Sequence, residues 1–486
     1  MPNPIAYLVL FSWPLVAWMM YRRMPLERAF VWTIIGGYLI LPPATEVDLP
    51  LLPPIDKLAI ANLSAFFLTI TVGKTKVELL PRSWAARILV LIFVFMTIPT
   101  ILTNGDTIII DAPFMDVGPM ESTLKVLPGM VLREVISFSS IQIIIHLLPF
   151  LVAHSVLASP TGRRELLRAL MIGGLIYTIP SLFEIRFSPQ INIWVYGFFQ
   201  HNFQQMIRGF GFRPIVFLPH ALWLVFFLVN SAIAAAALSR TEPGEKRNKH
   251  LYAVFWLMAV IVLCQSMGST IYMLLLVPFI FMSTEAGRMR AALMMVILAL
   301  AYPSLRNAGL IPLDDLVEMA GRFSADRAQS LGFRFDNEEV LLQHAHERLI
   351  FGWGGWGRNL TFSEWDGTQE VIPDGRWILT VGTYGLVGFF AEFGLLALPV
   401  YLIWLRRKHP PEGDDLTHAG TLALLLGVTL IDMLINSPIV PYVWMIAGAL
   451  VGTAERAKVV NRGTRAVHSP KIDIKPVDKA EPRTII

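Results

Sequence analysis

The chain is divided into apolar runs that are each long enough to cross a lipid bilayer, and this feature limits its fold more than any other. Of the 486 residues, 55% are hydrophobic and only 16% are charged, whereas soluble domains carry about 25% charged residues. Backbone inside lipid must satisfy its own hydrogen bonds, so only helices and closed barrels can span a membrane. These runs are too long for barrel strands. We therefore expect an all-α fold, a polytopic transmembrane helical bundle.

The apolar runs predict about 12–13 spans, because a bilayer core requires roughly 20 helical residues for each crossing. They cover residues 4–21, 28–43, 57–73, 86–103, 134–157, 165–184, 214–238, 251–267, 269–284, 290–304, 378–405, 416–435 and 437–453. The chain then divides into ten helices in 1–304 with a smaller loop at 185–213, a large polar loop at 305–377, and C-terminal helices in 378–455. The tail at 456–486 combines prolines and charges with few large apolar residues, so we expect it to be disordered and cytoplasmic.

Lys and Arg gather in alternate connections, which predicts the orientation, since the basic side of a membrane protein faces the cytoplasm. The basic connections are 22–28, 74–87, 163–168, 240–249, 288–290 and 406–408. The N-terminus and both polar loops should therefore lie outside, with the C-terminus inside. The sequence contains no HExxH motif, no Cys/His ligand set and a single cysteine, Cys264. It therefore gives no support for a metal site, a cofactor or a nucleic-acid partner.

The two outer loops contain arginines and no lysine. An arginine side chain presents a planar fork that binds phosphate through two hydrogen bonds and stays charged. We single out Arg208 and Arg213 in the smaller loop and Arg334 in the large one as candidates for binding a lipid phosphate or pyrophosphate. The alternative is that these arginines pair with the many acidic residues of the same loops.

Residues 330–350 have apolar side chains at helical spacing, which predicts an amphipathic helix with a charged face. Arg334 and Glu338 are four residues apart and would share that face, and His346 follows two turns after Glu338. In a functional interpretation, Arg334 binds an anion while Glu338, Glu339 or His346 transfers a proton. The alternative is a solvated helix with one intrahelical ion pair between Arg334 and Glu338.

A glycine- and tryptophan-rich segment at 352–357 ends the amphipathic region, and the large loop closes on an Asp-Gly-Arg-Trp sequence at 374–377. The rings of Trp353 and Trp356 could stack on a sugar or anchor in the headgroup region. Asp374 could act as a base with a raised pKa or simply cap the following helix. Arg348 and Arg376 complete the candidate binding residues of this loop.

Three stretches of the sequence together resemble the O-antigen ligase and O-antigen or exopolysaccharide polymerase family of bacterial inner-membrane proteins. The first is the Arg-Gly-Phe-Gly-Phe-Arg-Pro segment at 208–214, and the second is Arg334 followed by its helix and the segment at 349–357. The third is the pair Tyr-Gly-Leu-Val-Gly at 384–388 and Glu-Phe-Gly-Leu at 392–395. The likeness covers about residues 205–400.

The resemblance implies a metal-independent, inverting glycosyltransferase of the bacterial inner membrane that needs no cofactor. Its donor would be an undecaprenyl-pyrophosphate-linked oligosaccharide at the periplasmic face, with Arg213 and Arg334 matching the two family arginines that bind the pyrophosphate. A chain-length regulator or an export complex would be its protein partner.

One departure from the family pattern bears on the activity. The ligases carry a histidine just before the span after the large loop, and here that place reads Pro-Asp-Gly-Arg-Trp at 373–377. The proton would then go to Asp374, His344 or His346, and the departure favours a polymerase of repeat units over a ligase. A ligase with another acceptor, or a transporter of lipid-linked oligosaccharides, remains as the alternative.

Overall fold

The structure is a computed structural model that describes residues 1–48, 53–111, 124–209, 211–322, 324–410, 414–437 and 440–466. Helices dominate it, as the sequence predicts. Those of the first part are α1 (Pro4–Arg23), α2 (Leu26–Ile40), α3 (Lys57–Thr71), α4 (Trp84–Phe95), α5 (Thr97–Leu102), α6 (Glu134–Ile141), η1 (Gln142–Leu147), α7 (Leu148–Val156), α8 (Pro160–Phe187) and α9 (Ile191–Tyr196).

The second part continues with the short helix η2 and then with longer helices. They are η2 (Phe203–Met206), α10 (Ala221–Thr241), α11 (Glu245–Leu263), α12 (Met267–Met282), α13 (Glu285–Asn307), α14 (Leu313–Gly321), α15 (Ala325–His346), α16 (Arg376–Arg406), α17 (Ala419–Ile435) and α18 (Pro441–Ala466). Two small antiparallel hairpins, which the sequence did not predict, are β1 (Ile108–Asp111) with β2 (Leu124–Leu127) and β3 (Ile207–Arg208) with β4 (Gly211–Phe212).

Seven helical segments in the described part of the chain are long and apolar enough to cross a membrane, so the chain is a multi-pass membrane protein. Three shorter apolar helices, α3, α12 and α17, accompany them. Each of the thirteen predicted spans overlaps one helix or a run of two or three consecutive helices. The exact number of crossings stays a prediction.

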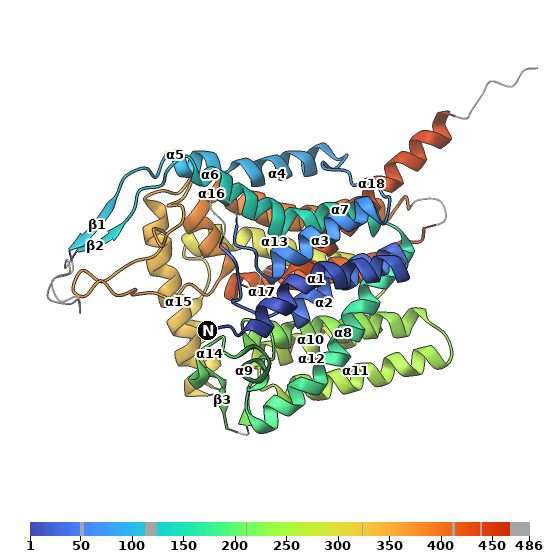
Figure 1. The fold of residues 1–486 in the computed structure, drawn as a ribbon, viewed down its shortest axis with the longest axis horizontal. Helices are drawn as coiled ribbons and strands as arrows, with labels where there is room; N and C mark the ends of the chain where they lie inside the picture. The colour runs from blue at the N-terminus through green and yellow to red at the C-terminus, as the bar shows by residue number, and fades with distance from the viewer. Residues whose placement is uncertain are drawn as a thin grey trace, which may run out of the picture.

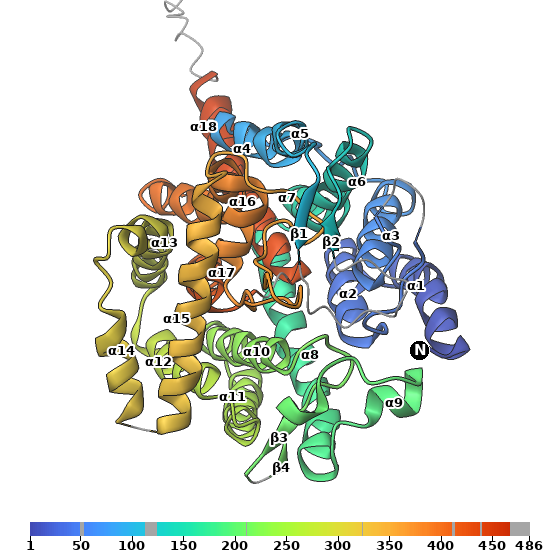
Figure 2. The same ribbon diagram turned by 90° about the vertical axis from the view of Figure 1, so that its left-hand side faces the viewer.

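The bundle has two distinct ends. In Figure 1 its helices run roughly horizontally, with α14, α15 and both hairpins gathered at the left-hand end near the N-terminus and with the end of α18 projecting at the right. Figure 2 looks onto that left-hand end and shows α15 lying across the ends of other helices. Helix α10 forms the centre of the core, since 89% of the residues in its most apolar stretch are buried.

Ion pairs join the basic connections to one another at the end opposite α15. Arg163 binds Asp414 at 2.6 Å, and Arg28 binds Glu165 at 2.8 Å. Segments far apart in the sequence therefore meet at this end, as expected if the basic connections share one side of the membrane.

Two predicted boundaries are wrong, and one predicted span has a kink. The span predicted to begin at 214 begins at Ala221, because Pro214 and Pro219 hold the preceding segment out of a helix. Helix α18 extends to Ala466, so residues 456–466 of the tail predicted to be disordered are helical, and the rest of that tail lies outside the described residues. Helix α16 is kinked at Gly385, whose φ is +67°, a conformation that glycine adopts without strain.

Candidate functional site

Four arginines from two segments far apart in the sequence lie near enough to interact electrostatically at the α15 end of the bundle. Arg208 lies in β3 and Arg213 directly follows β4, while Arg327 and Arg334 lie on α15. Burial, and after it the neighbouring charges of Arg208, Arg327 and Arg334, together lower the pKa of Arg213 to about 10. We call these four residues the arginine cluster.

The arginine cluster has few counter-charges. No ion pair joins Arg208, Arg213 or Arg327 to an acidic residue in the part of the chain that the structure describes. The Nε of Arg213 is buried without a hydrogen-bond partner, and its Nη2 donates only a long bond of 3.5 Å to the carbonyl of Gln265. Gathering unpaired cations in a partly buried place is unfavourable unless an anion joins them.

The β3–β4 hairpin is pressed against α8, and this places Arg213. A Cβ on Gly211 would lie 2.5 Å from the carbonyl oxygen of Ile185, and the φ of Gly211 is +131°, so only glycine fits this turn. The amide of Arg213 donates to the carbonyl of Met206 at 2.8 Å. The backbone on both sides of Arg213 is therefore fixed.

Glu184, near the C-terminal end of α8, holds the segment that follows Arg213. Its carboxylate is fully buried and accepts the amides of Ile215 and Val216, each at 2.8 Å, and the amide of Ile191 at 3.2 Å. Glu184 is not among the site residues predicted from the sequence. An acid at the end of an apolar run is the signal that could have found it.

Arg334 is placed by contacts with the ends of α16 and α17. Its Nε lies 3.3 Å from a carboxylate oxygen of Asp374, and its Nη1 donates to the Oδ1 of Asn436 at 3.3 Å. The alternative prediction of an intrahelical ion pair between Arg334 and Glu338 is wrong. Glu338 instead pairs with Arg306 at 3.0 Å.

Asp374 does not cap α16. The cap position is Gly375, and it makes no side-chain capping bond. Burial raises the pKa of Asp374, and the neighbouring Arg334 guanidinium opposes that rise. Asp374 is thus a partly buried carboxylate in direct contact with a cluster arginine, which are properties of a candidate base.

His220 adds a neutral donor beside the cluster. Its Nδ1 accepts the amide of Leu222 at 2.9 Å and caps α10, so the proton of the neutral ring is on Nε2. The pKa of His220 falls to about 4 through burial and then through the charges of His201, Arg213 and Arg334. It stays neutral near pH 7.

Glu338 acts as a structural junction. It is buried and accepts hydrogen bonds from Tyr302 at 2.9 Å, from Arg306 at 3.0 Å and from Trp377 at 2.9 Å. These bonds attach α15 to α13 and α16. Burial raises its pKa, while the three donors oppose that rise. Its acceptor capacity is used within the protein, so Glu338 is a poorer candidate base than Asp374.

The cavity beside Arg334, Glu338 and Asp374 is small. It holds about 20 Å³, which is room for about one water molecule. A sugar cannot enter it. A ligand of the arginine cluster would therefore lie on the face of α15 that turns towards the β3–β4 hairpin.

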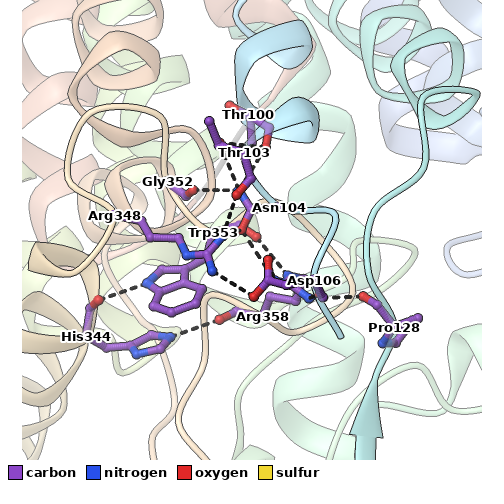
Figure 3. A network of polar contacts seen from close by, with 10 residues as sticks. All are labelled: Thr100, Thr103, Asn104, Asp106, Pro128, His344, Arg348, Gly352, Trp353 and Arg358. Carbon is purple, nitrogen blue, oxygen red and sulfur yellow. Dashed lines mark hydrogen bonds and ion pairs between the residues drawn. The ribbon is translucent and has the colours of Figure 1, made fainter. Parts of the chain in front are cut away.

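Figure 3 shows a second group of arginines, which attaches the large loop to the segment after α5. Arg358 is fully buried; it donates to the carbonyl oxygens of Asp106 at 2.7 Å and Pro128 at 3.1 Å and pairs with the Asp106 carboxylate at 3.1 Å. Arg348 binds the same carboxylate at 2.8 Å. The two guanidinium groups hold the pKa of Asp106 below its usual value.

Trp353 lies between two side chains of this network. His344 stacks on its ring at 4.3 Å between centroids, and the Arg348 guanidinium lies 4.3 Å from the ring centroid. Its Nε1 donates to the carbonyl of His344 at 2.8 Å. We name the Trp353 network as Asp106, His344, Arg348, Trp353 and Arg358. Here the aromatic ring packs within the protein, away from the arginine cluster.

The remaining predicted residues lie outside the arginine cluster. Arg376 binds Glu392 through two bonds of 2.8 and 3.1 Å. Trp356 donates to Glu134 at 3.0 Å. His346 is exposed at the end of α15. The structure thus brings Arg208, Arg213, Arg334 and Asp374 together, and it places these three elsewhere.

One group of side chains among the described residues has the spacing of metal ligands. It consists of Glu78, His154 and Glu455 at the other end of the bundle, with ligand atoms within 4.8 Å of one another. Glu455 already accepts from His154 at 2.7 Å and from the backbone amides of Arg82 and Ser83. These bonds account for its burial without an ion.

No protein-family model matches this chain, and no curated protein is significantly similar to it.

Proposed function

We propose that the chain is a membrane glycosyltransferase that polymerises undecaprenyl-pyrophosphate-linked oligosaccharide repeat units of a surface or exopolysaccharide. The reaction is metal-independent and inverting, and it takes place at the periplasmic face of a bacterial inner membrane. The N-terminus lies in the periplasm and the C-terminus in the cytoplasm. The arginine cluster, with its shortage of counter-charges, carries this proposal.

In the proposed reaction the arginine cluster binds the pyrophosphate of the donor. A hydroxyl oxygen of the acceptor attacks the anomeric carbon, the bond from that carbon to the pyrophosphate oxygen breaks, and the lipid pyrophosphate leaves with the electron pair. The leaving group gains negative charge in the transition state, and preorganised arginines stabilise that charge. Asp374, in contact with Arg334, accepts the hydroxyl proton.

The arrangement favours a transferase over a transporter. Transporters place their polar substrate sites near the middle of the bilayer. Here Arg213 and Arg334 lie in the outer loop and on the outer helix α15, whereas the acid of α16, Glu392, is already paired with Arg376.

The test is the repeat-unit ladder of the surface glycan in a deletion strain. The strain is complemented with wild type, Arg213→Ala, Arg334→Ala or the control Arg322→Ala, and membrane levels are checked for each. Arg322 is exposed in the same outer loop and pairs with Glu318. We expect single repeat units after deletion, and a ladder restored by wild type and Arg322→Ala only.

Other ladders would change the conclusion. Long polymer that stays on its lipid carrier after deletion would identify a ligase. Wild-type ladders from both cluster variants would remove the arginine cluster from the reaction and return the transporter alternative.

A further inference from the structure

A second polar pocket lies at the opposite end of the bundle, and it does not depend on the proposed transferase activity. Its volume is about 440 Å³, and it is lined by residues of α8, the α10–α11 turn and the segment before α17. Pockets of this size are typical of small-ligand sites. The charged and titratable side chains in its lining are Arg164, Glu242, Lys246, Asp415 and His418.

The two carboxylates of this pocket are already engaged. Glu242 accepts two bonds from Arg164, one of them 2.8 Å long from Nε. Asp415 accepts the amide of Thr417 at 2.9 Å, and bonds to Thr417 hold its pKa below the usual value. In contrast, Lys246 forms no ion pair with any described residue. The lining therefore keeps one cation, Lys246, that no carboxylate of the described residues contacts directly.

His418 supplies an independent indication of a missing ligand. It lines the pocket and is only 3% exposed, yet its Nδ1 is buried without a hydrogen-bond partner. Its backbone is left-handed, with φ of +68°, which is uncommon for a residue other than glycine. Buried polar atoms are nearly always paired, and strained residues concentrate at binding sites.

The surroundings of His418 are positively charged. Burial, and after it the charges of Arg163, Arg164 and Arg288, together lower the pKa of His418 to about 4. The first turn of α8 also faces this region, because Thr161 lines the pocket and helix N-termini attract anions. The Nε and Nη2 of Arg164 both donate to Glu242. The third nitrogen, Nη1, donates to no acceptor in the described part of the chain and is free for a ligand.

We propose that this pocket binds a phosphate group, held by Lys246, by the free donor of Arg164 and by His418. Two sources carry this chemistry: the headgroup of an anionic phospholipid in the adjoining leaflet and a soluble phosphorylated molecule. Basic pockets between helices at the cytoplasmic side are known to bind phospholipid headgroups. Phosphate supplies acceptors for all three side chains, which a neutral sugar or an amine does not.

The test uses the purified full-length chain and two probes. One probe is inorganic pyrophosphate added to protein in nanodiscs of phosphatidylcholine, and the other is phosphatidylglycerol incorporated into those nanodiscs. Thermal unfolding measures binding, because a ligand of the folded state raises the midpoint. An effect of phosphatidylglycerol alone indicates a headgroup, and an effect of pyrophosphate indicates a soluble ligand. Both outcomes support a phosphate site.

Two variants and one matched control localise the effect. Lys246→Gln and His418→Asn should each lower the affinity for whichever probe stabilises the wild type about tenfold. Each substitution removes a hydrogen bond to the charged phosphate. Asparagine tolerates a left-handed backbone, so His418→Asn should fold. The control is Lys249→Gln, which makes the same charge change on α11 at a lysine paired with Glu245. The proposal is overturned if neither probe stabilises wild type, or if the stabilisation is equal in all three variants.

Discussion

The arginine cluster and the Trp353 network lie at the same end of the bundle, but they differ in what neutralises their arginines. In the Trp353 network, Arg348 and Arg358 share the carboxylate of Asp106 at 2.8 and 3.1 Å. In the arginine cluster, a single carboxylate at 3.3 Å serves Arg334, and Arg213 keeps a buried Nε without a partner. The comparison teaches that an abundance of arginine does not identify an anion site, whereas a shortage of counter-charge does.

The largest expected effect is the loss of glycan transfer when an arginine of the arginine cluster is replaced. Arg334→Ala should reduce glycan transfer about 10²–10³-fold, because it removes a donor that stabilises the leaving group. Its unfolding midpoint should stay near wild type, since the contacts of Arg334 with Ile435, Asn436 and Asp374 are all long, at 3.3 to 3.4 Å. Transfer rates and melting curves of the purified protein check both expectations. Normal transfer with a lowered midpoint would make Arg334 a structural residue like Arg358.

The opposite pattern is expected in the Trp353 network. Arg358→Met should lower the free energy of unfolding on the order of 3 kcal/mol, because it leaves the carbonyl oxygens of Asp106 and Pro128 without their donor. The transfer rate per folded molecule should change little. Thermal unfolding in detergent measures the change in stability, and the transfer rate is divided by the amount of folded protein. An unchanged midpoint would show that the network is not the scaffold of the large loop.

A smaller effect is expected at Glu184, which acts through Arg213. Glu184→Ala should reduce transfer about tenfold, since it releases the backbone amides of Ile215 and Val216. The double variant Glu184→Ala/Arg213→Ala should be no less active than Arg213→Ala, because both changes remove the same interaction. Additive losses in this double-mutant cycle would contradict the positioning role.

The smallest effect is a shift in pH dependence at Asp374. Burial raises the pKa of this carboxyl, so its proton is lost at a higher pH than from an ordinary aspartate. Transfer should therefore fall as pH decreases through that raised pKa, and Asp374→Asn should be slow without this acid limb. For stability the sign is opposite: the folded state keeps a proton that the unfolded chain has lost, so this group makes unfolding easier as pH rises from 3.8. An acid limb retained in Asp374→Asn would exclude Asp374 as the base.

The sequence predicted the helices because apolar runs are a local signal, and the outer position of the polar loops stays a prediction from charge asymmetry. It also singled out Arg213 and Arg334, which the structure brings together. It could not predict the partners of Arg334 or Glu338, since Asn436 is 102 residues from Arg334 and Arg306 is 32 residues from Glu338. The residues of the segment at 352–357 were candidates for binding sugars. Only the fold shows that Trp353 is held between His344 and Arg348.

The most direct measurement is the binding of undecaprenyl pyrophosphate to the purified chain. Wild type, Arg213→Ala/Arg334→Ala and the control Arg322→Ala would be compared at one ionic strength. Loss of two charge-assisted contacts should weaken binding by the double variant at least about 100-fold, and the control should bind like wild type. Equal affinities for all three proteins would contradict the claim that the arginine cluster is the site for the lipid pyrophosphate.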